Sequence, residues 1–166
     1  MQIKLNSLHI DNFKGIKVLD VTFGDKTQIS GQNASGKTTI FDAFTWLLFN
    51  KNSAGEEKFN IRPLDENGNR VDNVEIKVVA VLDVDGKEVE LCIDTWPWIP
   101  TFLEIEGPSE KVVWDTAKKL GLKKEKAKFG SVDTTYEHYY GVDPDIVNLH
   151  TPKILFDMDP PEWAKK

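Results

Sequence analysis

One eight-residue segment constrains the fold of this chain more than any other part of the sequence. Residues 31–38 read Gly-Gln-Asn-Ala-Ser-Gly-Lys-Thr and fit the pattern G-x-x-x-x-G-K-[ST]. Extended apolar stretches precede the segment at residues 18–23 and 26–30, and a helical pattern of apolar residues follows at 39–49. The alternative is a glycine turn that merely precedes a helix. A strand, a glycine-rich loop and a helix in this order predict a phosphate-binding loop.

The chemistry of such a loop predicts a role for each part. Backbone N–H groups of the loop and the positive end of the helix dipole would hold the β-phosphate. Lys37 would reach the β- and γ-phosphates as a point charge, and the hydroxyl of Thr38 would ligate Mg²⁺. The choice between ATP and GTP stays open, because the residues that contact the base lie outside the loop.

Composition narrows the class of protein. The chain has 21 Lys and Arg against 27 Asp and Glu, a net charge of −6, which argues against a generally basic nucleic-acid surface but leaves room for a local patch. A single cysteine, Cys92, allows no internal disulfide, and three scattered histidines predict no structural metal site. No stretch approaches the roughly 20 apolar residues of a membrane span, and the first six residues lack the apolar core of a signal peptide. We therefore expect a cytoplasmic protein without a membrane partner.

The composition of the chain changes near residue 91. Asn occurs nine times before Cys92 and once after it, whereas Pro occurs once before and seven times after. Four of the five Trp and all three Tyr also follow Cys92. A step of this size predicts two segments of different origin, residues 1–91 and 92–166.

Local patterns place the secondary structure. An Asp85-Gly86 turn joins two of the expected strands, residues 50–57 form a turn-rich stretch, and residues 65–69 have hairpin chemistry. Strands are expected at residues 2–10, 16–23, 74–84, 88–94 and 101–106, and helices at 39–49, 109–120 and 132–140.

Capping residues mark the expected helix ends in the second segment. Ser109 and Asp133 are predicted N-caps, and Gly121 and Gly141 end the two helices that they begin. Asp143 is predicted to cap a short third helix. There are no heptads and no internal repeats, so no coiled coil is expected.

A resemblance to a known family covers the first segment. It runs through residues 8–16 (Leu-His-Ile-Asp-Asn-Phe-Lys-Gly-Ile), the phosphate-binding loop, 41–49, 61–65 and 81–89. This part of the chain resembles the N-terminal head segment of the SMC/SbcC-type AAA ATPases, the ABC-like ATPases of DNA repair. The resemblance implies ATP and Mg²⁺ as cofactors and DNA as a possible partner. The net negative charge of the chain does not favour contact with DNA.

The same resemblance extends the predicted nucleotide site to the Asn-Phe-Lys segment, which lies near the nucleotide in that family; the alternative for this segment is a strand-end turn. The residues predicted to contact the nucleotide are Asn12, Lys14, Gly31, Gln32, Asn33, Ala34, Ser35, Gly36, Lys37, Thr38 and Thr39.

The departures from the family pattern concern hydrolysis. ABC-like heads need a Walker B carboxylate pair and a Ser-Gly-Gly signature supplied across a dimer, and this chain has no Ser-Gly-Gly. Asp83 and Asp157 each end an apolar run, but Val84 and Met158 stand where the water-polarising Glu would be. Asp83 is better explained by the turn that follows it. We therefore expect ATP binding without efficient turnover, and a homodimer or a partner chain that supplies the absent motifs.

The second segment resembles another family. Residues 93–107, with 129–133, 139–141 and 160–163, are similar to the C-terminal part of a CYTH domain, the triphosphate-tunnel fold. Glu104 and Glu106 would share one strand face and, by this resemblance, hold Mg²⁺ or Mn²⁺. The alternative is an exposed strand face with alternating acids.

The CYTH resemblance is incomplete. The N-terminal Glu-x-Glu-x-Lys strand of that family is absent, with residues 73–77 the nearest string, and the chain has only two arginines for the tunnel.

These observations predict an α/β protein: a P-loop NTPase half-head with a mixed sheet, followed by a small α+β segment. The first functional reading is an ATP-binding protein of the DNA-repair ATPase type. The alternatives are a metal-dependent triphosphate-binding or triphosphatase protein, and a non-catalytic chimera.

Overall fold

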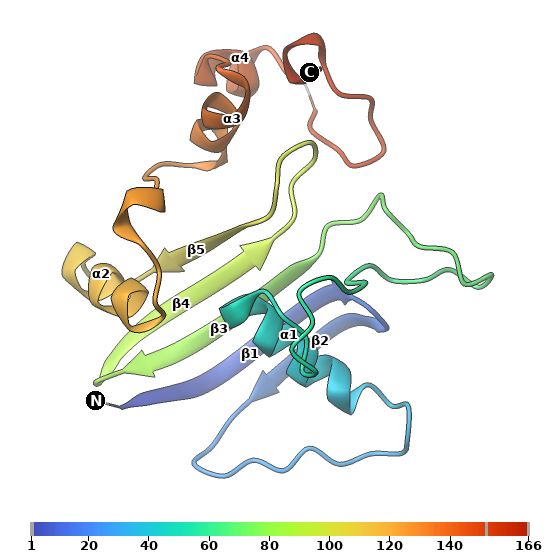
Figure 1. Cartoon of the computed structure of the whole chain (residues 1–166), viewed down its shortest axis with the longest axis vertical. Coiled ribbons are helices and arrows are strands. Elements are labelled where there is room, and N and C mark those ends of the chain that lie inside the picture. Colours follow the sequence, from blue (N-terminus) through green and yellow to red (C-terminus); the bar gives the residue numbers. More distant parts are fainter. Residues whose placement is uncertain (1, 152, 166) are drawn as a thin grey trace.

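A single sheet organises the chain in the computed structural model, which describes residues 2–151 and 153–165. Its strand order is β2-β1-β3-β4-β5, and every pairing between these strands is antiparallel (Figure 1). The strands are β1 (Ile3–Phe13), β2 (Ile16–Thr22), β3 (Lys77–Val84), β4 (Lys87–Asp94) and β5 (Phe102–Glu106).

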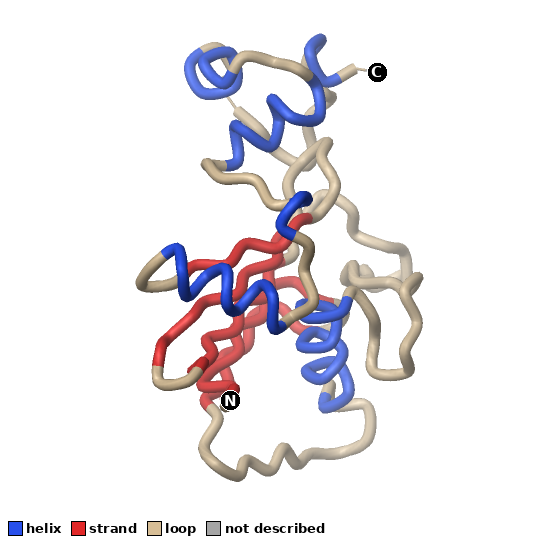
Figure 2. The backbone as a smooth tube through the Cα atoms, turned by 60° about the vertical axis from the view of Figure 1, so that its left-hand side comes forward, coloured by secondary structure: helices blue, strands red, loops and turns tan. Residues whose placement is uncertain are grey.

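The helices lie on one face and at one end of this sheet (Figure 2). They are α1 (Lys37–Phe49), α2 (Glu110–Lys119), α3 (Val132–Tyr140) and α4 (Pro144–Leu149), with short 3-10 turns at Lys124–Lys126 and Glu162–Ala164. The α/β class expected from the sequence is confirmed. No helix among the described residues has the length and apolar character needed to cross a membrane.

The β3–β4 hairpin forms at the predicted Asp85-Gly86 turn. Both residues have positive φ, 53° and 78°, as a two-residue hairpin turn requires. The Oδ1 atom of Asp83 accepts a hydrogen bond from the backbone N–H of Gly86 at 2.7 Å, which confirms that Asp83 serves the turn. The compositional step near residue 91 falls inside β4, which pairs with β3 on one side and β5 on the other.

The two faces of the sheet differ in chemistry because successive side chains of a strand point to opposite sides. We call the face against which α1 and α2 pack the covered face; it holds buried side chains such as Ile10, Val78 and Leu91. We call the opposite face the open face. Its acidic side chains, which follow from the register of the strands, are Asp11, Asp20, Asp83, Glu88, Glu90, Asp94, Glu104 and Glu106.

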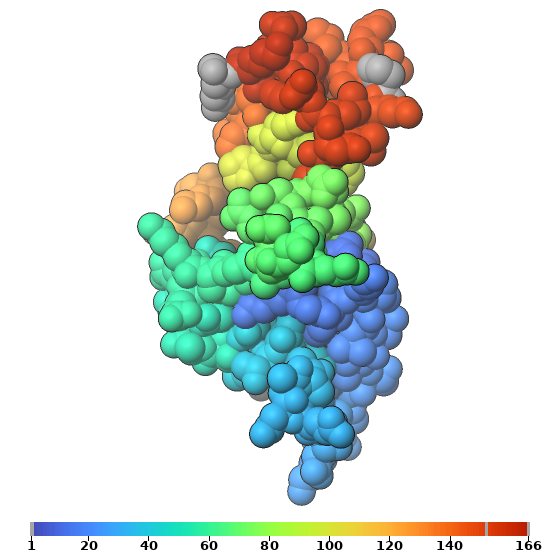
Figure 3. All heavy atoms as spheres, turned by 90° about the vertical axis from the view of Figure 1, so that its right-hand side faces the viewer, coloured from blue at the N-terminus to red at the C-terminus, as the bar shows by residue number. Residues whose placement is uncertain are grey.

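A second, smaller core joins α3, α4 and the C-terminal segment to the β4–β5 connection. Its centre is Tyr136, whose hydroxyl donates a hydrogen bond of 2.8 Å to the carbonyl of Pro97. The ring of Trp163 packs edge-on against Tyr136 at 5.6 Å between centroids. This core places the last part of the chain at one end of the molecule, opposite the loop that precedes α1 (Figure 3).

The mixed sheet expected from the sequence was wrong, because every pairing of the described strands is antiparallel. Two expectations about local segments were also wrong. Residues 26–30 form no strand and belong to an exposed loop between β2 and α1, in which even Ile29 is 41% exposed. A strand needs a neighbour for its backbone groups, and none of the described strands pairs with this stretch.

The second error concerns the start of α3. The N-cap is Ser131, not Asp133; the carboxylate of Asp133 instead accepts bonds from the hydroxyl of Ser131 and the amide of Asn148. The other two predicted caps are confirmed, because Ser109 accepts from the N–H of Val112 and Asp143 accepts from that of Asp145.

Candidate functional site

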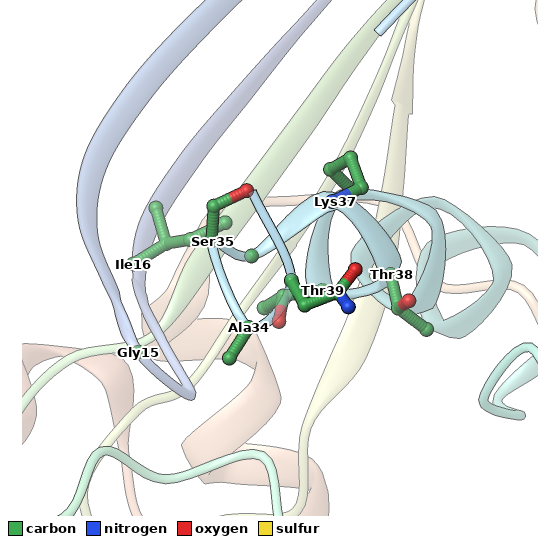
Figure 4. Close-up of a pocket in the computed structure, with 9 residues that line it drawn as sticks. Gly15, Ile16, Ala34, Ser35, Lys37, Thr38 and Thr39 are labelled. Atoms are coloured by element: carbon green, nitrogen blue, oxygen red, sulfur yellow. The ribbon is translucent and has the colours of Figure 1, made fainter. Parts of the chain in front are cut away.

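A pocket of about 450 Å³ lies at the N-terminus of α1. Six of its nine lining residues belong to the predicted phosphate-binding loop at 31–38, and Thr39 follows them on α1. The other two lie where the turn after β1 leads into β2 (Figure 4). The lining residues are Gly15, Ile16, Asn33, Ala34, Ser35, Gly36, Lys37, Thr38 and Thr39.

The loop is shaped by residues in the left-handed region. Gly36, the N-cap of α1, has φ 91°, and Ala34 has φ 63°. Gly31 allows a close approach, because a Cβ at this position would lie 2.7 Å from the hydroxyl oxygen of Ser35. These positions explain why two of the glycines in the pattern are needed here.

The N-terminus of α1 is open to an anion. No side chain caps it, and its first turn holds no acidic residue. The first N–H groups of a helix have no partner within the helix, so they face the pocket with the positive end of the helix dipole. This donor arrangement fits a phosphate group.

Lys37 is held by the loop itself. Its Nζ atom donates hydrogen bonds to the carbonyls of Gly31 at 2.8 Å and Gln32 at 2.6 Å. Within the part of the chain that the structure describes, Lys37 forms no ion pair with a carboxylate. The ammonium group therefore lies beside the pocket with only neutral oxygen partners. Gly31 and Gln32 do not line the pocket. They contribute the backbone carbonyls that accept hydrogen bonds from Lys37.

Asn12 and Lys14 form hydrogen bonds that fix the β1–β2 turn beside the pocket. The amide of Asn12 donates to the carbonyl of Glu75 at 2.9 Å. The Nζ of Lys14 donates to the buried carboxylate of Asp42 on α1 at 2.6 Å, and also lies 4.9 Å from the ring centroid of Phe59. Both residues have positive φ, which turns the chain so that the next two residues reach the pocket. Their contact with a nucleotide stays a prediction.

The Lys14–Asp42 pair fixes α1 against the β1–β2 turn. Burial alone would raise the pKa of Asp42, but the hydrogen bonds from Lys14 and from the hydroxyl and N–H of Ser53 outweigh it and hold the pKa below its usual value. The carboxylate is thus charged and joins three segments that are distant in sequence. Asp42, Gly15 and Ile16 were not predicted from the sequence as parts of the site. Asp42 stands in an apolar run, and this is a signal that its carboxylate is buried and needs a partner.

Glu104 and Glu106 lie on β5, away from this pocket, and share the open face as predicted. Burial, then the neighbouring carboxylates of Asp94 and Glu106, raises the pKa of Glu104. Among residues 2–151 and 153–165, no three His, Cys, Asp or Glu side chains are grouped so as to hold a metal ion. Metal binding by this pair stays a prediction.

A family model described as AAA domain matches residues 7–141, which cross the compositional step near residue 91. None of the curated proteins matches the chain.

Solved structures provide a fold-level comparison. The structure of the recombination mediator protein RecF with ATP, from the RecFOR pathway, has a TM-score of 0.51 at 18% identity, over 65% of this chain and 29% of that one. A second RecF structure, titled RecF-ATPrS, has a TM-score of 0.50 at 18% identity, over 67% and 29%. The SMC head domain from Thermotoga maritima has a TM-score of 0.49 at 24% identity, over 68% and 41%. The present chain therefore spans less than a third of the RecF chains whose fold it shares.

Proposed function

The chain belongs to the AAA domain family, and on that premise we propose that residues 31–39 bind ATP together with Mg²⁺. The observation that carries this proposal is the arrangement at the start of α1: an uncapped helix N-terminus beside a lysine whose only hydrogen-bond partners among the described residues are two loop carbonyls. Full negative charges on phosphate oxygens are stronger acceptors for an ammonium group than neutral carbonyls.

The N-terminus of α1, Lys37 and Thr38 have distinct parts in this binding. The N–H groups of residues 36–39 hold the β-phosphate, and Lys37 leaves the carbonyls of the loop to bridge the β- and γ-phosphates. The hydroxyl of Thr38 would hold Mg²⁺, a hard cation that prefers oxygen ligands. Asn12 and Lys14 would act at the margin of the site.

Efficient hydrolysis requires groups that this pocket lacks among its lining residues. None of the nine is an acid that could polarise water or hold the metal from the protein side. Because the acceleration of phosphoryl transfer comes from positioned charge and an oriented nucleophile, a loop that binds only phosphates lowers the dissociation constant without much lowering the barrier.

A second copy or another chain would complete the site. The outer side of α1 supports this: Phe41 and Phe49 are 55% and 59% exposed, so this helix is apolar on both sides. A helix that is hydrophobic all round is normally buried. By analogy with the RecF structures, the setting would be DNA repair or recombination.

Calorimetry of Mg²⁺-ATP binding tests the proposal. We expect one site whose affinity falls at least a hundredfold in Lys37→Ala and that tripolyphosphate competes for. Lys87→Ala is the matched control, because Lys87 is an exposed lysine at the start of β4 and is not among the lining residues of the pocket. An ATP affinity that is the same in Lys37→Ala and in the parent would refute the proposal.

The alternative from the CYTH resemblance predicts the reverse. If Glu104 and Glu106 held a metal against a triphosphate, Glu104→Gln with Glu106→Gln would abolish tripolyphosphate binding and Lys37→Ala would not.

A further inference from the structure

A second cavity, of about 420 Å³, lies between β5, α2 and α3 and shares no lining residue with the pocket at α1. Its lining includes β5, an edge strand of the sheet, and much of the segment that runs from the end of α2 to the start of α3, which we call the rim. Figures 1 and 2 show how these elements are arranged. A cavity of this size is in the range of small-molecule sites.

The rim concentrates positive charge in an acidic protein. Residues 118–128 contain six lysines and a single acid, Glu125, although the whole chain carries −6. Lys123, Lys126 and Lys128 line the cavity. Within the described part of the chain, none of these three forms an ion pair, so their charge is available to an anion.

An aromatic surface lies beside these lysines. Phe129 is 69% exposed and contacts Trp114 of α2 edge-on, with ring centroids 5.6 Å apart. The Nζ atom of Lys124 lies over the ring of Trp114, 4.6 Å from its centroid, in a cation–π contact. Exposure of a large aromatic ring to water is unfavourable. An aromatic ring beside lysines without ion pairs matches a ligand that carries both an aromatic group and a negative charge.

We propose that this cavity binds a nucleotide unit, an aromatic base joined to phosphate. The base stacks on Phe129 and Trp114, and the phosphate lies against Lys123, Lys126 and Lys128. Glu104 is the one carboxylate of the lining, at the β5 side, which directs the phosphate to the lysine side of the cavity.

The same chemistry has two sources, a free nucleotide and a nucleotide within a single strand. Both present a base and a phosphate, and a strand would add further phosphates for the remaining lysines of the rim. The proposal goes beyond ATP binding at α1 and does not depend on it.

The test uses the full chain with Lys37→Ala, so that the pocket at α1 is disabled. Binding of AMP and of an oligothymidylate is measured by fluorescence anisotropy and calorimetry at two salt concentrations. We expect at least one probe to bind, with Phe129→Ala weakening it about tenfold, as the loss of one stacked ring implies. Phe129→Tyr should restore binding, because it keeps the ring.

The lysines are tested by Lys123→Gln, Lys126→Gln and Lys128→Gln together, which should weaken binding and reduce its salt dependence. Lys17→Gln and Lys58→Gln together are the matched control for lost charge, since both lysines are exposed and outside the cavity. AMP binding supports a free nucleotide, and oligothymidylate binding alone supports a strand.

Three results overturn the proposal. They are no binding of either probe, binding that Phe129→Ala leaves unchanged, and equal binding of polyglutamate, which would indicate a surface for acidic peptides instead.

Discussion

The covered and open faces belong to the same five strands, yet different forces stabilise them. On the covered face, α1 brings Ala43, Trp46 and Leu47 into a continuous apolar core. On the open face, carboxylates from all five strands surround few cations, chiefly Lys77 and His9. Burial of apolar area does not depend on pH, whereas interactions between charges do.

This difference shows where a change in sequence or in solution should act. Substitutions on the covered face should destabilise the protein at every pH. Substitutions on the open face should have smaller effects that depend on pH. The following changes test the contrast, beginning with the largest expected effect.

Trp46→Ala should lower the free energy of unfolding by about 3–5 kcal/mol, the usual cost of removing a large buried aromatic. Trp46 is 4% exposed, and its ring packs against that of Phe13 with centroids 5.4 Å apart. Urea denaturation followed by circular dichroism measures the change. Phe49→Ala, on the exposed side of the same helix, is the control and should stay within roughly 0.5 kcal/mol. Equal losses in the two variants would contradict the assignment of the covered side of α1.

Lys14→Met should lower the free energy of unfolding by roughly 2–3 kcal/mol, because it leaves the carboxylate of Asp42 buried with only Ser53 as partner. The same variant should also raise the pKa of Asp42, since a bond that holds it below its usual value is lost. Urea denaturation at pH 7 and pH 4 measures both effects. The loss should be smaller at pH 4, where Asp42 can take up a proton in the variant. A pH-independent loss would show that Lys14 acts through packing alone.

Lys77→Met should destabilise the protein by roughly 1 kcal/mol or less at pH 7, because Lys77 is partly exposed and its Nζ lies a long 3.7 Å from the buried carboxylate of Asp94. Burial, followed by neighbouring carboxylates, raises the pKa values of Glu75 and Glu104. Burial also raises the pKa of Asp94, and the charge of Lys77 opposes that rise. A carboxyl group whose pKa is raised on folding contributes stability below its unfolded pKa and loses it as pH rises through its folded pKa.

Without Lys77, the carboxylates lose the cation that favours their charged forms. The fall in stability from about pH 4 to pH 7 should therefore be steeper in Lys77→Met than in the parent protein. Thermal unfolding across that range measures the slope, with Lys17→Met as control. If stability falls with pH equally in Lys77→Met and in the parent protein, Lys77 does not influence the charge of these carboxylates.

His9 provides the smallest expected effect. Its pKa is raised above 6.5 by hydrogen bonds with two carboxylates, of which Asp11 has the larger effect and Asp20 the smaller. Because the folded pKa is raised, the stabilisation is fully present below 6.5 and is lost as pH rises through the folded value. NMR titration of the His9 ring should show the raised pKa. Asp20→Asn should move it back toward 6.5, since Asp20 is the cross-strand partner of His9.

Short-range chemistry was the part of the fold that the sequence could predict. The glycine-rich loop before α1, the Asp85-Gly86 hairpin and the Ser109 cap each depend on a few adjacent residues, and all three formed as local elements, whereas phosphate binding by the loop stays a prediction. The pocket residues from Asn33 to Thr39 were identified for the same reason.

Long-range pairing was the part that failed. Nothing beside Lys14 in the sequence indicates Asp42, 28 residues later, and nothing beside residues 26–30 shows that the described strands leave them unpaired. Asp133 was a reasonable cap by residue type, but its carboxylate is drawn to Asn148 of α4, a partner visible only in the folded chain. Residue type alone predicts a capacity for hydrogen bonds and does not predict which partner is reached.

The carbonyl partners of Lys37 have a consequence for selectivity. An incoming ligand must replace two acceptors that the ammonium already has, so a ligand with a single weak acceptor gains little by the exchange. A polyphosphate offers several charged oxygens and gains from every one of them. If residues 31–39 bind ATP as proposed, Lys37 would therefore favour ligands by their charge, and a nucleoside or a sugar of similar size would bind weakly.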